Sequence, residues 1–260
     1  MLLCPVRDCH LALERGGRRL FCTCGHSFDF ARSGYVNLLQ PQERRSKMPG
    51  DTADAVAARR RLHDRGVTWP LLEGITSILE PSATDVVLDA GCGDGFYLGS
   101  LAEQFGFDAH GVDISIPAID AAARRFPKCE WIVANADRQI PYADQSFSII
   151  MSITARMNTE EFQRVLRKDG RLLVAIPAPE DLIELRGVGR DRAARTIETF
   201  ASGFSFVEQR RVTTTANLDA AALEDVLLSI YRPMRAEPLE AAMKVTFSLD
   251  LLLFQPKSGS

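Results

Sequence analysis

The sequence predicts an α/β protein with a mostly parallel sheet, preceded by a small metal-binding β-hairpin module. An apolar strand followed by a glycine-rich turn lies at Asp85–Phe96, and apolar strands alternate with helical segments after it. Four of the six cysteines fall within the first 24 residues. A chain of 260 residues is long enough for one large α/β unit with an attached module.

The composition is that of an ordinary globular protein. Hydrophobic residues make up 46% of the chain and charged residues 25%, which excludes disordered, collagen-like and coiled-coil classes. No apolar run reaches the roughly 18 residues that span a bilayer. The start, Met1 to Pro5, lacks the charged-then-apolar layout of a secretory signal. We therefore expect a cytoplasmic protein without membrane contact.

Charge is distributed unevenly along the chain. Residues 1–68 carry 12 Lys and Arg against 7 Asp and Glu, whereas residues 69–260 carry 19 against 27. A basic front half on an acidic body suggests a polyanionic partner that contacts only the front. A solvated, arginine-rich helix face explains the same imbalance equally well.

The N-terminal cysteines form a pattern typical of a zinc site. Four residues separate Cys4 from Cys9, and three separate Cys22 from His26, so two ligand pairs each lie on a short turn. Cys24 is an alternative ligand, and reduced thiols without metal are the other interpretation. Four protein ligands leave no open coordination position, so the predicted Zn²⁺ is structural. The leucines between the two pairs indicate a small hairpin.

A basic segment follows the zinc pattern. Arg32, Arg44, Arg45 and Lys47 surround a loop that Pro49 and Gly50 interrupt. Asp51 or Thr52 is then expected to cap a helix that carries Arg59, Arg60, Arg61 and Arg65. These arginines could contact phosphates, or they could pair with the acidic body.

The glycine turn after Asp89 indicates a nucleoside cofactor. Its glycines are Gly91, Gly93 and Gly95, and Phe96 stands where a dinucleotide fingerprint would place its third glycine. This phasing favours a cofactor without a pyrophosphate, such as S-adenosylmethionine, whose carboxylate could meet free N–H groups at the helix start.

Acidic residues after the next two strands complete the predicted cofactor site. Asp113 follows Asp89 by 24 positions and could accept both ribose hydroxyls. A strand at 130–134 precedes Asp137, which could accept from the adenine amino group. The candidate cofactor-binding residues are Asp89, Gly91, Gly93, Gly95, Asp113, Ile114, Asn135, Ala136 and Asp137.

Residues 84–177 resemble the class I S-adenosylmethionine-dependent methyltransferases. The resemblance depends on the glycine turn, Asp113, Asp137, the stretch from Pro141 to Phe147 and the Gly170 turn, all in the family's order. It implies a Rossmann-like, mostly parallel seven-stranded sheet, with late strands near 205–215 and 244–254 joined by a helix near 219–231. We divide the chain into a zinc-binding domain at 1–36, a basic linker with helices at 37–80 and a methyltransferase domain at 81–260.

The absence of two motifs narrows the range of possible methyl acceptors. The residues after the fourth strand, Ser152 to Arg156, lack the Asn/Asp-Pro-Pro-Tyr/Phe element of amino-group methylation. Carbon-5 methylation of pyrimidines needs a nucleophilic cysteine, and neither Cys92 nor Cys129 is suitably placed. The acceptors that remain possible are a ring nitrogen, an oxygen or a small molecule.

The front half is similar to the ribosomal RNA guanine-N1 methyltransferases of the RlmA type, which include macrolide-resistance members. The matching residues are the Cys and His set, Gly25 to Asp29, Gly34 to Leu39, Gly50-Asp51 and Ala57 to Arg60. The resemblance implies methylation at N1 of a guanine in helix 35 of 23S rRNA, near the peptide exit tunnel. The base would leave its stack to reach the donor, and Tyr35 or Trp69 could stack on it.

The chain departs from this family at two places. Ala155-Arg156 stands where the family has Ala-Pro, and four residues rather than two separate the first zinc ligands. No catalytic base is assigned, although Asp94, Glu160 and Glu161 are eligible. A small-molecule methyltransferase and a non-catalytic rRNA-binding relative are the alternative functions. A homodimer is a further expectation.

Overall fold

The computed structural model describes residues 1–7, 9–43, 49–230 and 242–257. Three residues of the predicted basic segment, Arg44, Arg45 and Lys47, lie outside this part of the chain.

The N-terminal module is a three-stranded antiparallel sheet. Its strands are β1 (Glu14–Gly16), β2 (Arg19–Phe21) and β3 (Ser27–Asp29), and β2 pairs with both neighbours. The turn between β1 and β2 contains Gly17 at a φ of +64°, a conformation that glycine adopts without strain. The predicted hairpin is therefore present, with β3 added to it. We call residues 1–36 with this sheet the ribbon.

The large sheet has eight strands in the order β10-β11-β9-β8-β5-β6-β7-β4. Neighbours from β9 to β4 run parallel, and β11 pairs antiparallel with both β9 and β10. The bounds are β4 (Val36–Asn37), β5 (Val86–Ala90), β6 (Asp108–Asp113), β7 (Glu130–Val133), β8 (Phe147–Ile153), β9 (Leu166–Pro177), β10 (Phe204–Leu218) and β11 (Met243–Pro256).

The short strand β4 is an addition to the seven predicted strands. It pairs parallel with β7, through Val36 opposite Ile132 and Asn37 opposite Val133. It lies across the predicted boundary at residue 36, and the division into three domains stays a prediction. The pairing places the end of the ribbon at one edge of the large sheet.

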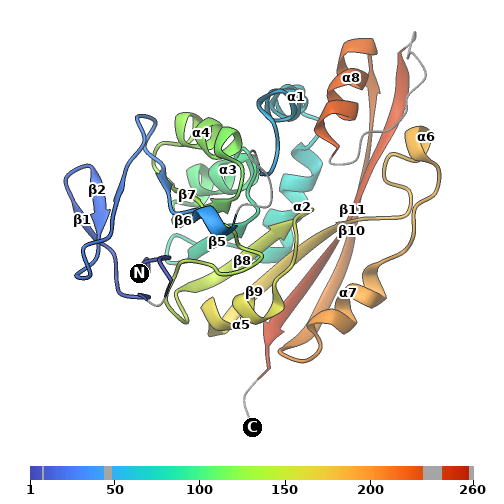
Figure 1. Cartoon of the computed structure of the whole chain (residues 1–260). Coiled ribbons are helices and arrows are strands. Elements are labelled where there is room, and N and C mark those ends of the chain that lie inside the picture. The colour runs from blue at the N-terminus through green and yellow to red at the C-terminus, as the bar shows by residue number, and fades with distance from the viewer. Residues whose placement is uncertain (8, 44–48, 231–241, 258–260) are drawn as a thin grey trace.

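Helices cover both faces of the sheet (Figure 1). Side chains of α2, α3 and α4 form a buried cluster on one face, and those of α5 and α7 form another cluster together with the ribbon on the opposite face. A third cluster joins α1 and α8 to the ends of β10 and β11. The bounds are α1 (Ala53–Asp64), α2 (Trp69–Leu79), α3 (Phe96–Phe105), α4 (Ile116–Arg125), α5 (Thr159–Val165), α6 (Ile183–Arg186), α7 (Ala193–Phe200) and α8 (Ala220–Ser229), with a short 3-10 helix at Pro41–Glu43.

Local capping fixes where several helices begin. The Thr52 side chain accepts a hydrogen bond from the Ala55 N–H and starts α1, as the sequence predicts. Ser115 caps α4 in the same way through the Ala118 N–H. None of the described helices has both the length and the apolar character that crossing a membrane requires.

The ribbon packs directly against the large sheet. Buried Cys4, Leu13 and Leu20 belong to the same cluster as Ile140 and Tyr142 of the body. The backbone adds to this contact, since the Leu3 N–H donates to the Pro141 carbonyl at 2.9 Å. Ribbon and body therefore share one hydrophobic core, and unfolding the ribbon would expose part of it.

Candidate functional site

The four predicted zinc ligands come together in the ribbon. The ligand atoms of Cys4, Cys9, Cys22 and His26 all lie within 4.8 Å of one another. The Nδ1 atom of His26 is 3.4 Å from the sulfur of Cys4 and from that of Cys22, and the Cys9 and Cys22 sulfurs are 3.7 Å apart. A tetrahedral Zn²⁺ with ordinary bond lengths would separate two sulfurs by ~3.8 Å and a sulfur from a nitrogen by ~3.6 Å. The donor set therefore fits zinc in both chemistry and size.

The burial of Cys4 also supports a metal ion at this cluster. Burial raises the pKa of its thiol to about 12, so a thiolate at this position needs a cation beside it. Cys24 is exposed and lies outside the group of four. The distances therefore favour His26 with three cysteines over the alternative that uses Cys24, and the ligand set stays a prediction.

The glycine turn lies at the carboxyl end of β5, as predicted. Gly91, Gly93 and Gly95 have φ values of +85°, +55° and +74°, which other residues rarely adopt. A side chain at Gly91 would collide with Ala155, which follows β8. Helix α3 begins at the end of this turn without a side-chain cap, so its first N–H groups can receive an anionic group.

Asp113 is held rigidly at the end of β6. One carboxylate oxygen accepts the Gly93 N–H at 2.9 Å, and the other accepts the Ser115 N–H at 2.8 Å. Burial raises the pKa of Asp113, and these two hydrogen bonds oppose the rise. Because each oxygen has a second lone pair, the carboxylate can still accept from two further hydroxyl groups.

Three buried polar atoms in or beside the turn have no hydrogen-bond partner in the described part of the chain. They are Oδ1 of Asp89 on β5, Oδ2 of Asp94 within the turn and Oγ of Ser152 on β8. Unpaired buried polar groups are costly and mark places where a ligand or water completes the bonding. Nearby, Thr154 adopts a φ of +50° at the end of β8, a strained conformation often found at functional sites. These features fit a polar cofactor at the carboxyl edge of β5 and β8.

The burial of Asp89 predicts a pH-dependent stability. Burial, together with the charge of Asp113, raises the pKa of Asp89 to about 8. The carboxyl is therefore protonated in the folded protein and ionised in the unfolded chain between about pH 4 and pH 8. Its contribution to stability is complete below about pH 4 and is lost as the pH rises toward 8.

We expect Asp89→Asn to remove this part of the pH dependence. The Tm of the cofactor-free variant, relative to the parent protein, should increase between about pH 5.5 and about pH 8.5 because the amide cannot ionise. Thermal unfolding at the two pH values measures the difference. A Tm difference that does not change with pH would contradict the assignment.

The remaining candidate cofactor residues lie at the ends of β6 and β7. Ile114 is half-buried and lies close to Gly50. A Cβ added to Gly50 would lie only 3.0 Å from the Ile114 side chain. Asn135 is buried and donates to the Glu43 carbonyl at 3.4 Å. Ala136 is half-buried, and the exposed Asp137 faces Arg156 at 3.4 Å. The structure therefore brings the predicted residues to one edge of the sheet.

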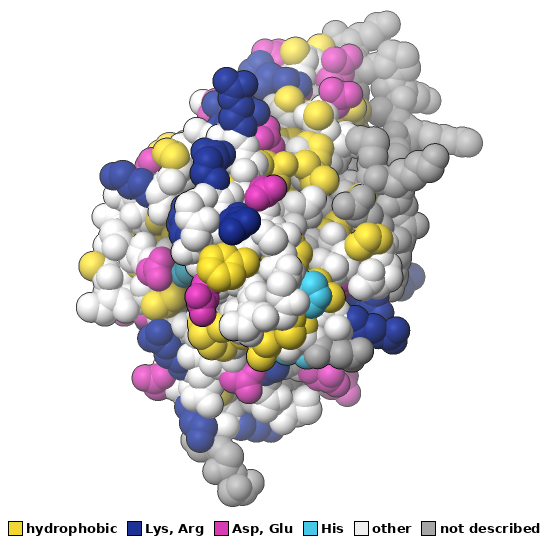
Figure 2. Space-filling view, turned by 60° about the vertical axis from the view of Figure 1, so that its left-hand side comes forward, with side chains coloured by type: hydrophobic (Ala, Val, Ile, Leu, Met, Phe, Trp, Pro, Cys, Tyr) yellow, Lys and Arg dark blue, Asp and Glu magenta, His cyan; other side chains and the backbone are white. Residues whose placement is uncertain are grey.

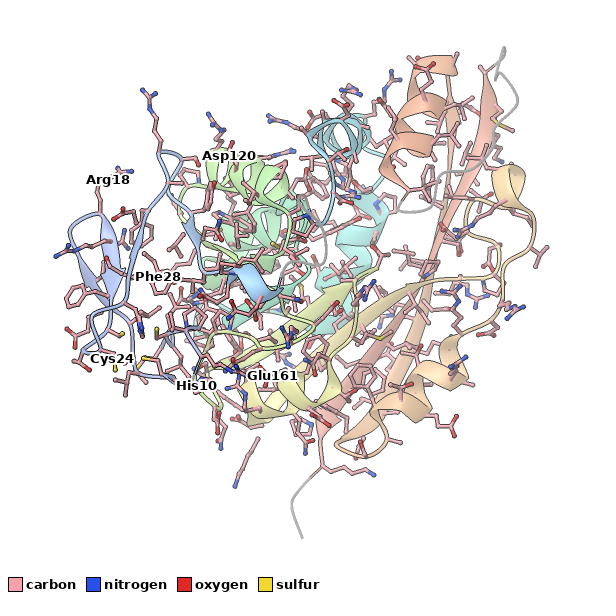
Figure 3. All side chains as sticks on the ribbon, in the orientation of Figure 1. His10, Arg18, Cys24, Phe28, Asp120 and Glu161 are labelled. Atoms are coloured by element: carbon pink, nitrogen blue, oxygen red, sulfur yellow. The ribbon has the colours of Figure 1, made fainter. Side chains whose placement is uncertain are left out.

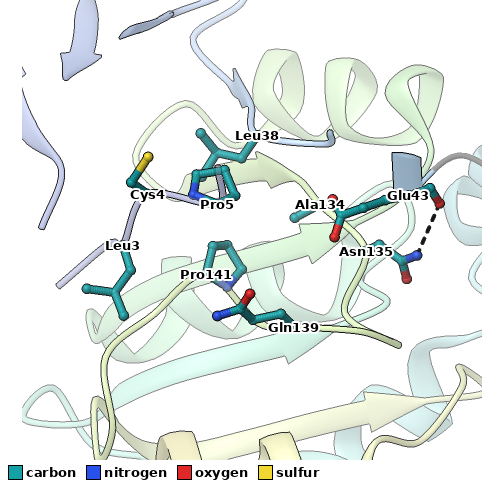
Figure 4. A pocket seen from close by; sticks show the side chains of 9 residues that line it. All are labelled: Leu3, Cys4, Pro5, Leu38, Glu43, Ala134, Asn135, Gln139 and Pro141. Carbon is teal, nitrogen blue, oxygen red and sulfur yellow. Dashed lines mark hydrogen bonds between the residues drawn. The ribbon is translucent and has the colours of Figure 1, made fainter. Parts of the chain in front are cut away.

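A narrow crevice separates this edge from the ribbon (Figure 4). It has room for little more than a water molecule, so it is too small for a nucleoside. Its lining residues are Leu3, Cys4, Pro5, Leu38, Glu43, Ala134, Asn135, Gln139 and Pro141. The Asn135 side chain is part of this contact between ribbon and body.

The arginines of α1 pair with carboxylates, so one of the two interpretations of the basic segment is favoured. Arg61 contacts Asp225 at 2.5 Å, and Arg65 contacts Asp219 at 3.2 Å, both at α8. Arg59 pairs with Asp51 and Arg60 with Asp64. These ion pairs favour the alternative of pairing within the protein, and contact of these side chains with phosphates stays a prediction. The partners of Arg61 and Arg65 could not be identified from neighbouring residues, because Asp225 and Asp219 lie more than 150 positions later.

The eligible catalytic carboxylates have different surroundings. Glu161 accepts from the Ile140 N–H at 2.7 Å and from Arg164 at 2.6 Å, so its role is structural. Asp94 is buried and lies 3.5 Å from Nε2 of His63. Its pKa is lowered despite burial, because His63 and Arg59 favour the carboxylate. Glu160 is exposed at the start of α5.

Comparison with known proteins covers both modules. A family model described as the RlmA N-terminal zinc ribbon matches residues 2–47, and a methyltransferase-domain model matches residues 87–174. A Streptomyces fradiae protein named 23S rRNA (guanine(748)-N(1))-methyltransferase is 37% identical over 256 aligned residues, covering 94% of this chain and 89% of that protein. The chain belongs to the family of 23S rRNA guanine-N1 methyltransferases. It is therefore an S-adenosylmethionine-dependent methyltransferase with a zinc ribbon.

A further member of the guanine-N1 methyltransferase family agrees with this placement, and solved structures share the fold of the methyltransferase domain. YxjB of Bacillus subtilis, provisionally named for the same activity, is 31% identical, covering 97% of this chain and 96% of YxjB. The Bacillus subtilis protein YcgJ matches 72% of this chain at a TM-score of 0.52 and 17% identity, covering 98% of YcgJ. A methyltransferase-like protein of Bacillus halodurans also matches 72% of the chain, at a TM-score of 0.53 and 17% identity, covering 99% of that protein. These two structures support the fold, and the predicted class I fold is confirmed.

Proposed function

We propose that this protein methylates N1 of a guanine in helix 35 of 23S rRNA, the hairpin near the peptide exit tunnel. The observation that carries the proposal is the match to the Streptomyces fradiae protein, because it extends over the ribbon as well as the methyltransferase domain. A methyltransferase domain alone would be compatible with many acceptors. Macrolide resistance, cytoplasmic location and a homodimer, all expected from the sequence, remain part of this proposal.

The methyl donor is proposed to bind along the carboxyl edge of β5, β6 and β7. S-adenosylmethionine would supply the methyl group from its sulfonium centre to guanine N1, S-adenosylhomocysteine would leave, and the proton of N1 would pass to a base or to water. Asp113 would accept from the ribose hydroxyls, because both of its oxygens are already oriented by backbone N–H groups. The other proposed donor-site residues are Asp89, Gly91, Gly93, Gly95, Ile114, Asn135, Ala136 and Asp137. The zinc ligands proposed for the ribbon are Cys4, Cys9, Cys22 and His26.

The ribbon offers a surface for RNA. Five of its arginines are exposed, and none of them forms an ion pair with another described residue; they are Arg7, Arg15, Arg18, Arg19 and Arg32. In Figure 3, Arg18 lies on the outer side of the ribbon, where its guanidinium donates to the Ala31 carbonyl at 2.9 Å, whereas His10 lies between ribbon and body. Figure 2 shows the ribbon side of the molecule, where Lys and Arg are spread among acidic and apolar side chains. Unpaired arginines spread in this way suit contacts with an RNA backbone.

An aromatic residue is available for a base that leaves its stack. Trp69 is 51% exposed and meets Phe96, the residue after the glycine turn, edge to face. Tyr35 is half-buried and packs against the cluster that contains α2, α3 and α4. Stacking of a base on an exposed ring is worth roughly 1–3 kcal/mol, so Trp69 suits this role better than Tyr35.

Primer extension on unmodified 23S rRNA tests the proposed site. N1 methylation blocks base pairing, so reaction with the protein and donor is expected to produce one new stop, within helix 35. Methyl label that appears only in small molecules would support the rival small-molecule methyltransferase. An absence of transfer to any acceptor would support the non-catalytic relative, and either result would contradict the proposal.

A further inference from the structure

Arg59 differs from the other arginines of α1. Its side chain is 27% exposed, compared with 51% for Arg60, 55% for Arg61 and 44% for Arg65. Its guanidinium lies against the glycine turn, since Nη1 is 3.4 Å from the position that a Cβ of Gly93 would occupy. A residue from the linker helix therefore reaches the proposed donor site.

Two hydrogen bonds orient this guanidinium. Nη1 donates to Asp51 at 2.6 Å, and Nη2 donates to the Ser229 carbonyl at 3.1 Å. A guanidinium has five N–H groups, so three remain without a partner among the described residues. Asp51 is itself fixed, because its carbonyl accepts the Ser115 hydroxyl at 2.7 Å, beside Asp113.

The position of Arg59 relative to Asp113 indicates which part of the donor it meets. Asp113 accepts the Gly93 N–H, while Nη1 of Arg59 lies 3.4 Å from the position that a Cβ on the same glycine would occupy. If Asp113 binds the ribose hydroxyls, the amino-acid part of the donor lies next to the glycine turn. This part carries a carboxylate. A guanidinium binds carboxylates through paired, charge-assisted hydrogen bonds.

We propose that Arg59 binds the carboxylate of the methionine moiety of S-adenosylmethionine, with Asp51 positioning the guanidinium. This inference rests on the donor site proposed above. It makes α1 part of the cofactor site, and it assigns to the donor an arginine that the sequence pattern grouped with those expected to contact RNA. The contact with Ser229 extends the same network to the end of α8.

Two nucleoside ligands separate this role from a structural one. S-adenosylhomocysteine carries the amino-acid carboxylate, whereas 5′-methylthioadenosine shares its nucleoside but lacks the amino acid. In calorimetric titrations, Arg59→Gln is expected to weaken S-adenosylhomocysteine binding by about 10-fold or more and to leave methylthioadenosine binding unchanged. Arg59→Lys should retain part of the lost affinity, because it keeps the charge without the paired donors.

Arg60→Gln is the matched control, since Arg60 is the next residue of α1 and pairs only with Asp64 among the described residues. It should bind both ligands as the parent protein does. Equal weakening of both ligands by Arg59→Gln would show that the arginine only supports the fold, and no weakening of either would show no role; both results overturn the inference. If the parent protein itself fails to bind S-adenosylhomocysteine, the donor site rather than Arg59 is wrong.

Discussion

Replacing Cys22 by serine is expected to release the zinc and unfold the ribbon. The four ligand atoms lie within 4.8 Å of one another, so the loss of one thiolate removes a quarter of a compact site. Structural zinc contributes ~10–16 kcal/mol in peptide systems, and a module of this size cannot replace that with buried surface. Zinc content by metal analysis should fall from one per chain to near zero, and the Tm should fall with it.

Cys22→Ser should affect rRNA methylation and binding of the nucleoside cofactor differently. Methylation of rRNA should be lost, because the unpaired arginines lie on the ribbon, whereas binding of S-adenosylhomocysteine should persist at β5 and β6. Cys24→Ser is the matched control, since Cys24 is exposed and lies outside the cluster. Full zinc content in Cys22→Ser, or its loss in Cys24→Ser, would contradict the ligand assignment.

Asp113→Ala is expected to abolish measurable donor binding. The change removes both proposed hydrogen bonds to the ribose, and it leaves the Gly93 and Ser115 N–H groups without their acceptor. Losing two bonds to a charged group lowers affinity by about 100-fold or more. Titration with S-adenosylhomocysteine measures the loss, and the zinc content should stay at one per chain.

A control on the same strand separates this effect from damage to the sheet. Asp108 lies at the opposite end of β6 and is exposed, so Asp108→Asn should bind the nucleoside normally. Asp113→Asn keeps the size of the side chain and tests whether the charge is needed. Donor affinity in Asp113→Ala equal to that of the parent protein would refute the site.

Local patterns predicted much of this fold. The apolar run before Asp89 and the three glycines encode a buried strand and a tight turn, so β5 and the start of α3 follow from neighbouring residues. The proposed zinc ligands could also be predicted from neighbouring residues, because each pair of ligands lies on one short turn. The seven predicted strands are present, and the helix expected near 219–231 is α8 at Ala220–Ser229.

Contacts between distant segments could not be predicted in this way. Val36 joins the large sheet beside Ile132, and nothing in its two-residue strand indicates that partner. Arg61 pairs with Asp225, which lies 164 positions later. Such pairings depend on which distant segments the fold brings together. For this reason Arg61 and Arg65, which the basic run suggested for RNA contact, form ion pairs with Asp225 and Asp219.

The identity of the methylated nucleoside shows whether this protein modifies guanine N1 of 23S rRNA. The protein is incubated with methyl-labelled donor and unmodified 23S rRNA, and the RNA is digested to nucleosides for mass spectrometry. We expect the label to be recovered as 1-methylguanosine, at about one per rRNA molecule because a single hairpin is proposed as the target. Label in any other nucleoside, or RNA that remains unlabelled while the protein contains zinc and binds the donor, would contradict it.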